Sequence, residues 1–112
     1  MTIFEKIAAG QIPAKIIHQT EELFAFHDVN PQAPVHILIV PKRVITRIAE
    51  TGPADAALLG RLLAAAPEVA AKAGILESGF RLVINNGRDG GESVPHLHIH
   101  LLGGRPLAWP PG

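Results

Sequence analysis

Three histidines stand at alternate positions near the C-terminal end of the chain, in the stretch VPHLHIHLLGG at residues 94–104. Successive side chains of a β-strand point to opposite faces, so His96, His98 and His100 are expected on one face and the leucines and isoleucine between them on the other. An imidazole with an ordinary pKa of about 6.5 can act near neutral pH as a nucleophile or a base. The alternation therefore indicates a row of outward-facing imidazoles on a strand whose other face docks on the core.

A glycine-bearing loop, NNGRDGGESVP, comes directly before these histidines. Gly87, Gly90 and Gly91 allow the backbone to approach a ligand closely, and exposed N–H groups in such a loop can form an anion-binding nest. A plain turn with left-handed glycines gives the same pattern. Beside three imidazoles the loop favours a phosphate ligand, because a neutral imidazole can attack phosphorus while a protonated neighbour stabilises charge or protonates the leaving group.

Zinc is the alternative ligand of the row, since a His-x-His pair on a strand can supply two nitrogens to one ion. Residues at i and i+4 of a strand lie roughly 13 Å apart, so His96 and His100 cannot readily share an ion. No pattern in the sequence brings a third ligand to the row. The candidates for it are His18, His27, His36 and Asp28. We therefore assign no metal ligand and expect no cofactor, with zinc left as the less favoured interpretation.

Length and composition limit the classes of protein to consider. The chain has 112 residues, 47% of them hydrophobic and 18% charged, which is typical of one globular domain with a core. Ten Lys and Arg balance ten Asp and Glu, so a nucleic acid polymer or an anionic membrane is not expected as a partner. The absence of cysteine excludes thiolate chemistry. The N-terminal stretch lacks the apolar run of a secretion signal, so we expect a soluble, cytoplasmic protein.

The elements that position the histidines can be read from hydrophobic periodicity. Apolar residues at helical spacing predict a short N-terminal helix that ends at Gly10, and an Ala- and Leu-rich stretch predicts a long helix between Pro53 and Gly74. Pro67 should bend or divide that helix. Strands are predicted in a hairpin over residues 16–28, and at 35–41, 80–85 and 96–102. This order predicts an α+β fold with an antiparallel sheet of about five strands.

Four further segments accompany the His-apolar-His-apolar-His-apolar-apolar pattern of residues 96–102, and together they resemble the histidine triad superfamily. IFEKIAAGQIPAKII, FAFHDVNPQAPVHILIVPK, LVINNGRDGG and LLGGRPLAWPPG are all similar to its nucleotide-binding (Hint) branch. The resemblance covers nearly the whole chain, and the long helix is its least diagnostic part. It implies a single histidine triad domain over residues 1–112, with a C-terminal tail at 103–112, that forms a two-fold homodimer.

Proteins of the Hint branch bind purine nucleoside monophosphates and hydrolyse adenosine phosphoramidates and related AMP conjugates. The resemblance implies the same activity here, through a nucleotidyl-histidine intermediate. His98 would be the nucleophile, His96 would orient it through a backbone carbonyl, and His100 would contact the phosphate or the leaving group. A nucleotide-binding module with little catalysis is the alternative.

The same matching implies a set of binding residues. Asn85, Gly91 and Ser93 would hold phosphate oxygens, and Asp28 would bind the ribose hydroxyls. The C-terminal tail, with Trp109, would reach the partner subunit's site. The base would lie in a slot shaped by Phe4, Ile7, Ile12, Phe26, His27 and Val29. On composition alone, the apolar members of this slot are equally core residues, Asp28 is a turn residue and Trp109 is a surface anchor.

The chain departs from the Hint pattern at Val44, where many members carry a further histidine in the network behind the triad. Its absence should leave His98 in place and removes one metal ligand. His18 and His36 have no assigned chemistry and are expected to be ordinary sheet histidines.

Overall fold

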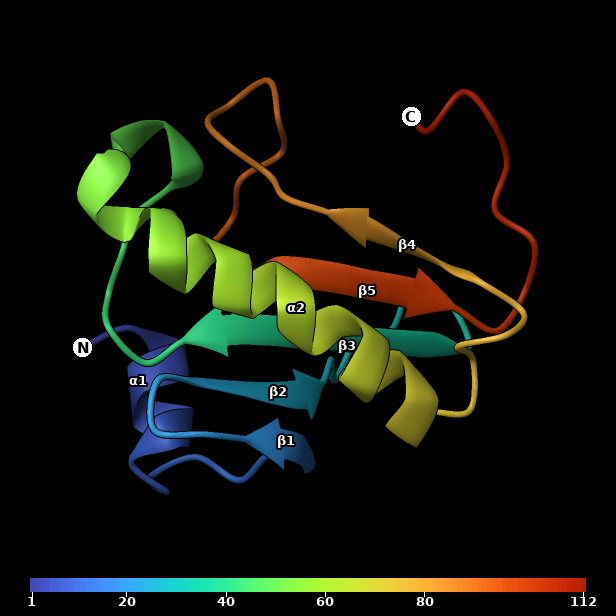
Figure 1. Ribbon diagram of the computed structural model, residues 1–112, viewed down its shortest axis with the longest axis horizontal. Coiled ribbons are helices and arrows are strands. Elements are labelled where there is room, and N and C mark those ends of the chain that lie inside the picture. The colour runs from blue at the N-terminus through green and yellow to red at the C-terminus, as the bar shows by residue number, and fades with distance from the viewer.

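A computed structural model describes residues 1–112 and shows one five-stranded sheet in the order β1-β2-β3-β5-β4 (Figure 1). Every neighbouring pair of strands is antiparallel. The predicted α+β fold with an antiparallel sheet is therefore confirmed. The strands are β1 (Ile16–Gln19), β2 (Leu23–His27), β3 (Val35–Pro41), β4 (Phe80–Val83) and β5 (Ile99–Gly103).

Two helices of unequal length cover opposite faces of this sheet. The long helix α2 (Ala56–Lys72) follows two short 3-10 turns, Ile48–Glu50 and Pro53–Asp55, and packs on the face that Figure 1 turns toward the viewer. The short helix α1 (Ile3–Ala8) lies on the other face. Of the two predicted effects of Pro67, division of the long helix is wrong, because α2 continues through it, while a bend stays a prediction. Pro67 is exposed, so the backbone bond that it removes lies on the solvent side.

The alternation of side chains along the central strand β3 sorts the core into two layers. Ile37 and Ile39 join the larger cluster beneath α2, whereas Leu38 and Val40 join the smaller cluster beneath α1. In the last part of the chain, Leu97, Ile99 and Leu101 all belong to the α2 cluster. The three histidines that alternate with them consequently face the α1 side.

The predicted last strand is longer than the observed one. Strand β5 begins at Ile99, so His96 and His98 lie in the segment just before it and only His100 is paired in the sheet. The backbone N–H groups of His96 and Leu97 donate instead to Val94 and Ile45. Strand β4 likewise ends at Val83, two residues before the predicted end.

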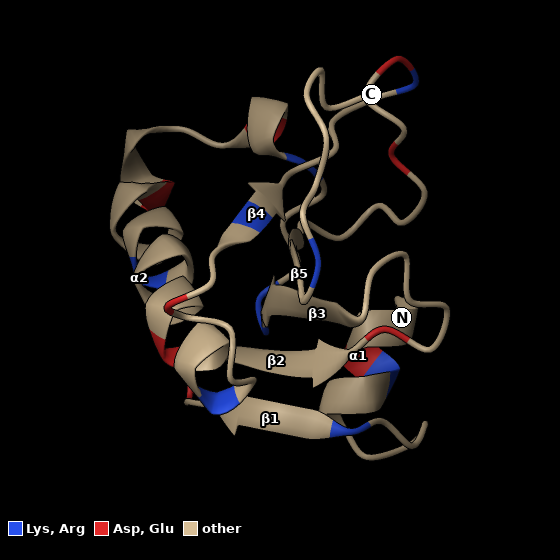
Figure 2. Cartoon of the chain, turned by 90° about the vertical axis from the view of Figure 1, so that its right-hand side faces the viewer, with Lys and Arg blue, Asp and Glu red and all other residues tan.

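Charged residues avoid the middle of the sheet. Strands β2, β3 and β5 carry no Lys, Arg, Asp or Glu, and Figure 2 shows basic and acidic positions interspersed around them. No helix of the chain combines the length and the apolar composition that crossing a membrane requires. The histidine row lies on the α1 face of these uncharged central strands.

Candidate active site

The His98 ring is held by the backbone of His96, two residues earlier in the chain. Its Nδ1 lies 2.7 Å from the backbone oxygen of His96. A carbonyl oxygen only accepts, so Nδ1 must carry the proton and donate it. In the neutral ring, the other nitrogen, Nε2, is then unprotonated and keeps its lone pair. This fixed tautomer presents a nucleophilic nitrogen to whatever lies beside the ring.

His96 is held at both ring nitrogens. Nε2 lies 2.8 Å from the backbone oxygen of Pro41 and therefore donates to it. Nδ1, at 2.7 Å from the Thr2 hydroxyl, then accepts from Thr2. Burial lowers the pKa of His96, which is fully inaccessible to solvent. A neutral His96 is thus fixed in position, and its backbone oxygen in turn holds the His98 ring.

The prediction that the imidazoles face outward is wrong for His96 and His98. His96 is 0% exposed and His98 is 7% exposed. The reason is α1, whose Phe4 packs edge-on against both rings, with ring centroids 5.4 Å from His96 and 4.9 Å from His98. The row points to the face that was predicted, but a helix covers that face.

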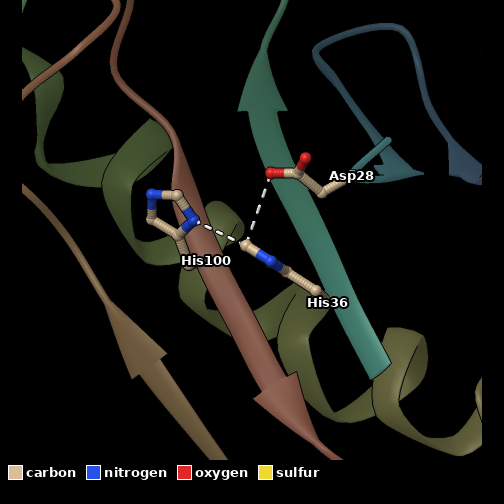
Figure 3. A group of neighbouring side chains, drawn as sticks. All are labelled: Asp28, His36 and His100. Atoms are coloured by element: carbon tan, nitrogen blue, oxygen red, sulfur yellow. Dashed lines mark hydrogen bonds and ion pairs between the residues drawn. The ribbon is translucent and has the colours of Figure 1, made fainter. Parts of the chain in front are cut away.

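His100 is oriented by His36, for which the sequence predicted no chemistry. The backbone N–H of Gln32 donates to Nδ1 of His36 at 3.0 Å, so the proton of His36 is on Nε2. That Nε2 donates to Nδ1 of His100 at 2.9 Å, with a carboxylate oxygen of Asp28 at 3.5 Å (Figure 3). His100 must then carry its own proton on Nε2. The description of His36 as an ordinary sheet histidine is therefore corrected.

Both members of this second pair are neutral near pH 7. The pKa of His100 falls to about 4, chiefly through burial and then through the charges that His98 and His36 would carry, against an opposing effect of Asp28. Burial likewise lowers the pKa of His36. At neutral pH His100 is consequently a hydrogen-bond donor through Nε2–H and not a proton-releasing imidazolium.

A metal ion has one candidate position in the chain. Ligand atoms of Asp28, His36 and His100 lie within 4.8 Å of one another, so three residues with no sequence pattern between them do converge. The hydrogen bonds favour a different use of these atoms. A metal on Nε2 of His36 would need the proton on Nδ1, where the Gln32 N–H already donates. The cluster fits a chain of neutral hydrogen bonds better than it fits an ion.

An apolar cavity of ≈ 280 Å³ opens beside His98 and His100. It lies between α1 and the sheet, and its polar members besides the two histidines are Asp28 and Ser93. Five of the six residues predicted for the base slot line it. The full lining is Ile3, Phe4, Ile7, Ile12, Pro13, Ala14, Phe26, Asp28, Val29, Leu38, Ser93, Val94, His98 and His100.

His27 is the predicted slot residue that the structure places elsewhere. It follows Phe26 on β2, and Phe26 faces α1, so the alternation turns His27 to the α2 side. There it lies beside Lys15, and its pKa is lowered by burial and by that positive charge. Val29, in contrast, lines the cavity at its rim and is 93% exposed.

Residues 9–107 match the HIT domain family. The chain belongs to the HIT family. It is 55% identical to an uncharacterised HIT-like protein of Synechocystis over 111 residues, which are 99% of this chain and 96% of that protein. A crystal structure of a HIT family hydrolase from Legionella pneumophila is 45% identical and superposes with a TM-score of 0.96, with 100% of both chains covered. A histidine triad nucleotide-binding protein from Candida albicans is 27% identical, with a TM-score of 0.83 over 98% of this chain and 83% of that one.

The glycine loop of this HIT chain is fastened by an ion pair that the sequence did not reveal. Glu92 accepts from Nε and Nη2 of Arg47 at 2.9 and 3.0 Å, and also from the backbone N–H of Gly87 at 2.9 Å. These bonds, led by the one with Arg47, lower the pKa of Glu92 to about 2. Arg47 and Glu92 are 45 positions apart, so no local motif could have paired them.

Two of the predicted phosphate residues do not line the cavity. Asn85 donates through Nδ2 to the backbone oxygen of Gly90 at 2.6 Å, and neither Asn85 nor Gly91 lines the cavity. A Cβ at Gly90 would collide with the backbone carbonyl of Asn86, which explains the glycine there. Of the three predicted phosphate residues, Ser93 lines the cavity, while phosphate contacts of Asn85 and Gly91 stay predictions.

The C-terminal tail is tied to the sheet through Arg81. Its Nη2 donates to the backbone oxygens of Leu107 at 3.3 Å and Ala108 at 2.9 Å, and its guanidinium lies 6.0 Å from the centre of the Trp109 ring. Trp109 nevertheless stays 81% exposed. Its predicted reach toward a partner subunit stays a prediction.

Val44, the position where the HIT chain departs from the Hint pattern, is 42% exposed. The ring nitrogens of His96 are already satisfied by Thr2 and Pro41. The bonds that orient His98 therefore need no side chain from position 44.

Proposed function

We propose that this protein is a purine nucleoside phosphoramidase of the Hint type, which hydrolyses adenosine 5′-phosphoramidates and related AMP conjugates. The observation that carries the proposal is the tautomer of His98. Its Nδ1–H is bonded to a backbone carbonyl, which leaves the Nε2 lone pair free beside a cavity that Asp28 and Ser93 also line. Membership of the HIT family and similarity to a nucleotide-binding relative support the assignment.

In the first proposed step, Nε2 of His98 forms a bond to the α-phosphorus as the bond from phosphorus to the leaving nitrogen breaks. The departing amine takes up a proton from water. Nε2–H of His100 donates a hydrogen bond to a phosphoryl oxygen, where negative charge is concentrated. Because Gln32 and His36 hold His100 in that tautomer, no proton needs to move to make this donor.

In the second step, water attacks phosphorus and loses a proton to the hydroxide that protonation of the amine left, the bond to Nε2 breaks, and the nucleoside monophosphate is released with His98 neutral again. Ser93 and the loop backbone would hold the remaining oxygens. Asp28 would accept from the ribose hydroxyls, and the base would lie among the apolar residues of the cavity. A carboxylate beside an apolar slot suits a nucleoside, which has a polar sugar on one side and a flat base on the other.

A His98→Ala variant tests the nucleophile. We expect turnover of adenosine 5′-phosphoramidate to fall by at least about 10³-fold, because the attacking atom is gone, while AMP still binds. His18→Ala, which alters a histidine on the opposite side of the sheet, is the matched control and should keep turnover within about twofold. Undiminished turnover in His98→Ala would refute the assignment.

Rapid quenching with radiolabelled substrate separates the enzyme from a nucleotide-binding module. We expect a covalent nucleotide on the wild-type chain and none on His98→Ala. A protein that only binds nucleotides would give no label in either case. Activity that persists in a chelator would count against the zinc interpretation.

We also propose that the protein is a homodimer in which the tail of one subunit approaches the site of the other. The unpaired edge of β4 supports this, because an edge strand invites pairing. Two exposed apolar residues lie near it: Ile84 directly follows the strand, and the Trp109 ring lies 6.0 Å from the guanidinium of Arg81 on β4. Light scattering after gel filtration should give twice the chain mass. Ile84→Asp should reduce the mass to one chain, whereas Leu63→Asp on the exposed side of α2 should not.

A further inference from the structure

We propose that Thr2 is a positioning residue for the reaction. Its hydroxyl ties the first turn of α1 to His96, and through that contact it sets both the His98 ring and one wall of the nucleotide cavity. The catalytic part of this inference rests on the proposed function, whereas the structural coupling between α1 and the triad does not.

The Thr2 hydroxyl makes two bonds with opposite roles. It accepts from the backbone N–H of Glu5 at 3.1 Å, as the N-cap of α1, and it lies 2.7 Å from Nδ1 of His96. In the neutral His96 ring, the one proton is on Nε2, which donates to Pro41, so Nδ1 has no proton and the hydroxyl donates to it. One oxygen thus closes a helix end and fixes a buried imidazole.

The consequence for His98 follows from the burial of His96. Without a donor, Nδ1 of a fully buried ring would be left unsatisfied, which is costly in a site closed to water. The ring would gain by rotating or by admitting water. Either change would shift the residue whose backbone oxygen holds Nδ1–H of His98.

The consequence for the cavity follows from the length of α1. A helix of six residues is too short to be stable alone, so its position depends on its anchors. Ile3, Phe4 and Ile7 of this helix line the cavity, and Phe4 also packs on the rings of the triad. The hydroxyl that fixes the His96 ring therefore also fixes the wall that the base would touch.

Substitutions in the capping box separate this role from simple helix capping. Thr2→Val removes the hydroxyl, and Thr2→Gly removes it while costing the helix end little. Glu5→Ala is the matched control, because it breaks the other half of the capping box, the bond from the Thr2 N–H to the Glu5 carboxylate. Thr2→Ser restores the hydroxyl.

With adenosine 5′-phosphoramidate we expect about tenfold lower kcat for Thr2→Val and Thr2→Gly, and values within about twofold of wild type for Thr2→Ser and Glu5→Ala. The KM should rise in Thr2→Val, because α1 loses its anchor. If Glu5→Ala lowers kcat as much as Thr2→Val, or if both hydroxyl-free variants keep wild-type kcat, the positioning role is refuted.

Nitrogen NMR of the imidazoles tests the coupling independently of turnover. Thr2→Val should shift the Nδ1 signal of His96 and weaken the proton signal of His98 Nδ1–H, while Glu5→Ala leaves both unchanged. If the wild-type chain fails to turn over the phosphoramidate, the proposed function falls, but these signals still decide on Thr2. Unchanged signals in Thr2→Val would overturn the inference.

Discussion

The row of histidines lines the cavity with His98 and His100, and the glycine loop reaches it at Ser93, so the two segments are the walls of the proposed site. These two walls are held in opposite ways. Each imidazole of the row is fixed by a neutral hydrogen bond at 2.7–2.9 Å, and two of the three bonds involve a backbone oxygen. The loop is fixed by an ion pair between side chains that are 31% and 13% exposed, Arg47 and Glu92. The geometry of the histidine row therefore depends on the exclusion of water, whereas the geometry of the loop depends on the attraction between Arg47 and Glu92.

This difference suits the tasks proposed for the two walls. A nucleophile needs a defined tautomer before substrate arrives, and neutral bonds to immobile carbonyls provide it without any counter-charge. A phosphate-holding loop must instead bring N–H groups to an anion, and a carboxylate on Gly87 shapes the loop from behind. The comparison predicts that the two walls respond differently to substitution, acid and salt.

Removing His36 should have the largest effect of the changes that spare the reacting atoms. In His36→Phe the buried Nδ1 of His100 loses its donor, so the ring is free to present a lone pair to the phosphate in place of N–H. We expect kcat/KM to fall roughly tenfold to hundredfold, measured with adenosine 5′-phosphoramidate. His18→Phe is the matched control and should stay within about twofold. Equal losses in both variants would argue against the hydrogen-bond chain.

Weakening the loop should have a smaller effect, confined to binding. Glu92→Gln keeps an acceptor for Gly87 but loses the charge that Arg47 faces, so we expect KM to rise about threefold with kcat little changed. Added NaCl should raise the wild-type KM more than that of the variant, because the ion pair is partly exposed. Glu50→Gln removes the other partner of Arg47 and should leave KM near wild type. A fall in kcat instead would place Glu92 closer to the chemistry.

Acid should affect the two walls in succession. His36, His96 and His100 have folded pKa values below the ordinary 6.5, so the unfolded chain binds more protons and their contribution to stability is lost as the pH falls from about 6.5 toward 4. Glu92, with its pKa at about 2, contributes fully above about 4.5 and loses its contribution only between 4.5 and 2. The test is the urea midpoint measured from pH 3 to 8. Compared with wild type, the midpoint of His36→Phe should fall less between pH 6.5 and 4, and that of Glu92→Gln should fall less below pH 4.5.

Local pattern was sufficient for the fold and for the face on which the histidines lie. The alternation of histidine with leucine and isoleucine separates site from core correctly, even though β5 begins only at Ile99. The same rule, applied to β2, would have turned His27 away from Phe26. The resemblance placed both residues in one slot, whereas neighbours on a strand face opposite sides of the sheet.

Pairings between distant parts of the chain were beyond the sequence. His36 meets His100 only because β3 pairs with β5, with Leu38 opposite His100. A histidine within the otherwise apolar strand VHILIVP was a signal that a buried partner exists, but not which one. The partnership of Arg47 with Glu92 had no local signal at all.

The two-residue period of the histidine stretch also constrains how this chain can change over generations. Because neighbours point to opposite faces, one residue inserted or deleted within residues 95–99 would turn leucine and isoleucine toward the cavity and the imidazoles toward the hydrophobic cluster beneath α2. Such a change would disrupt the proposed site and the hydrophobic core at the same time. Residues 95–99 can therefore change by substitution, or by insertion or deletion of two residues. The loop of residues 86–92 has no such period and is free of this restriction.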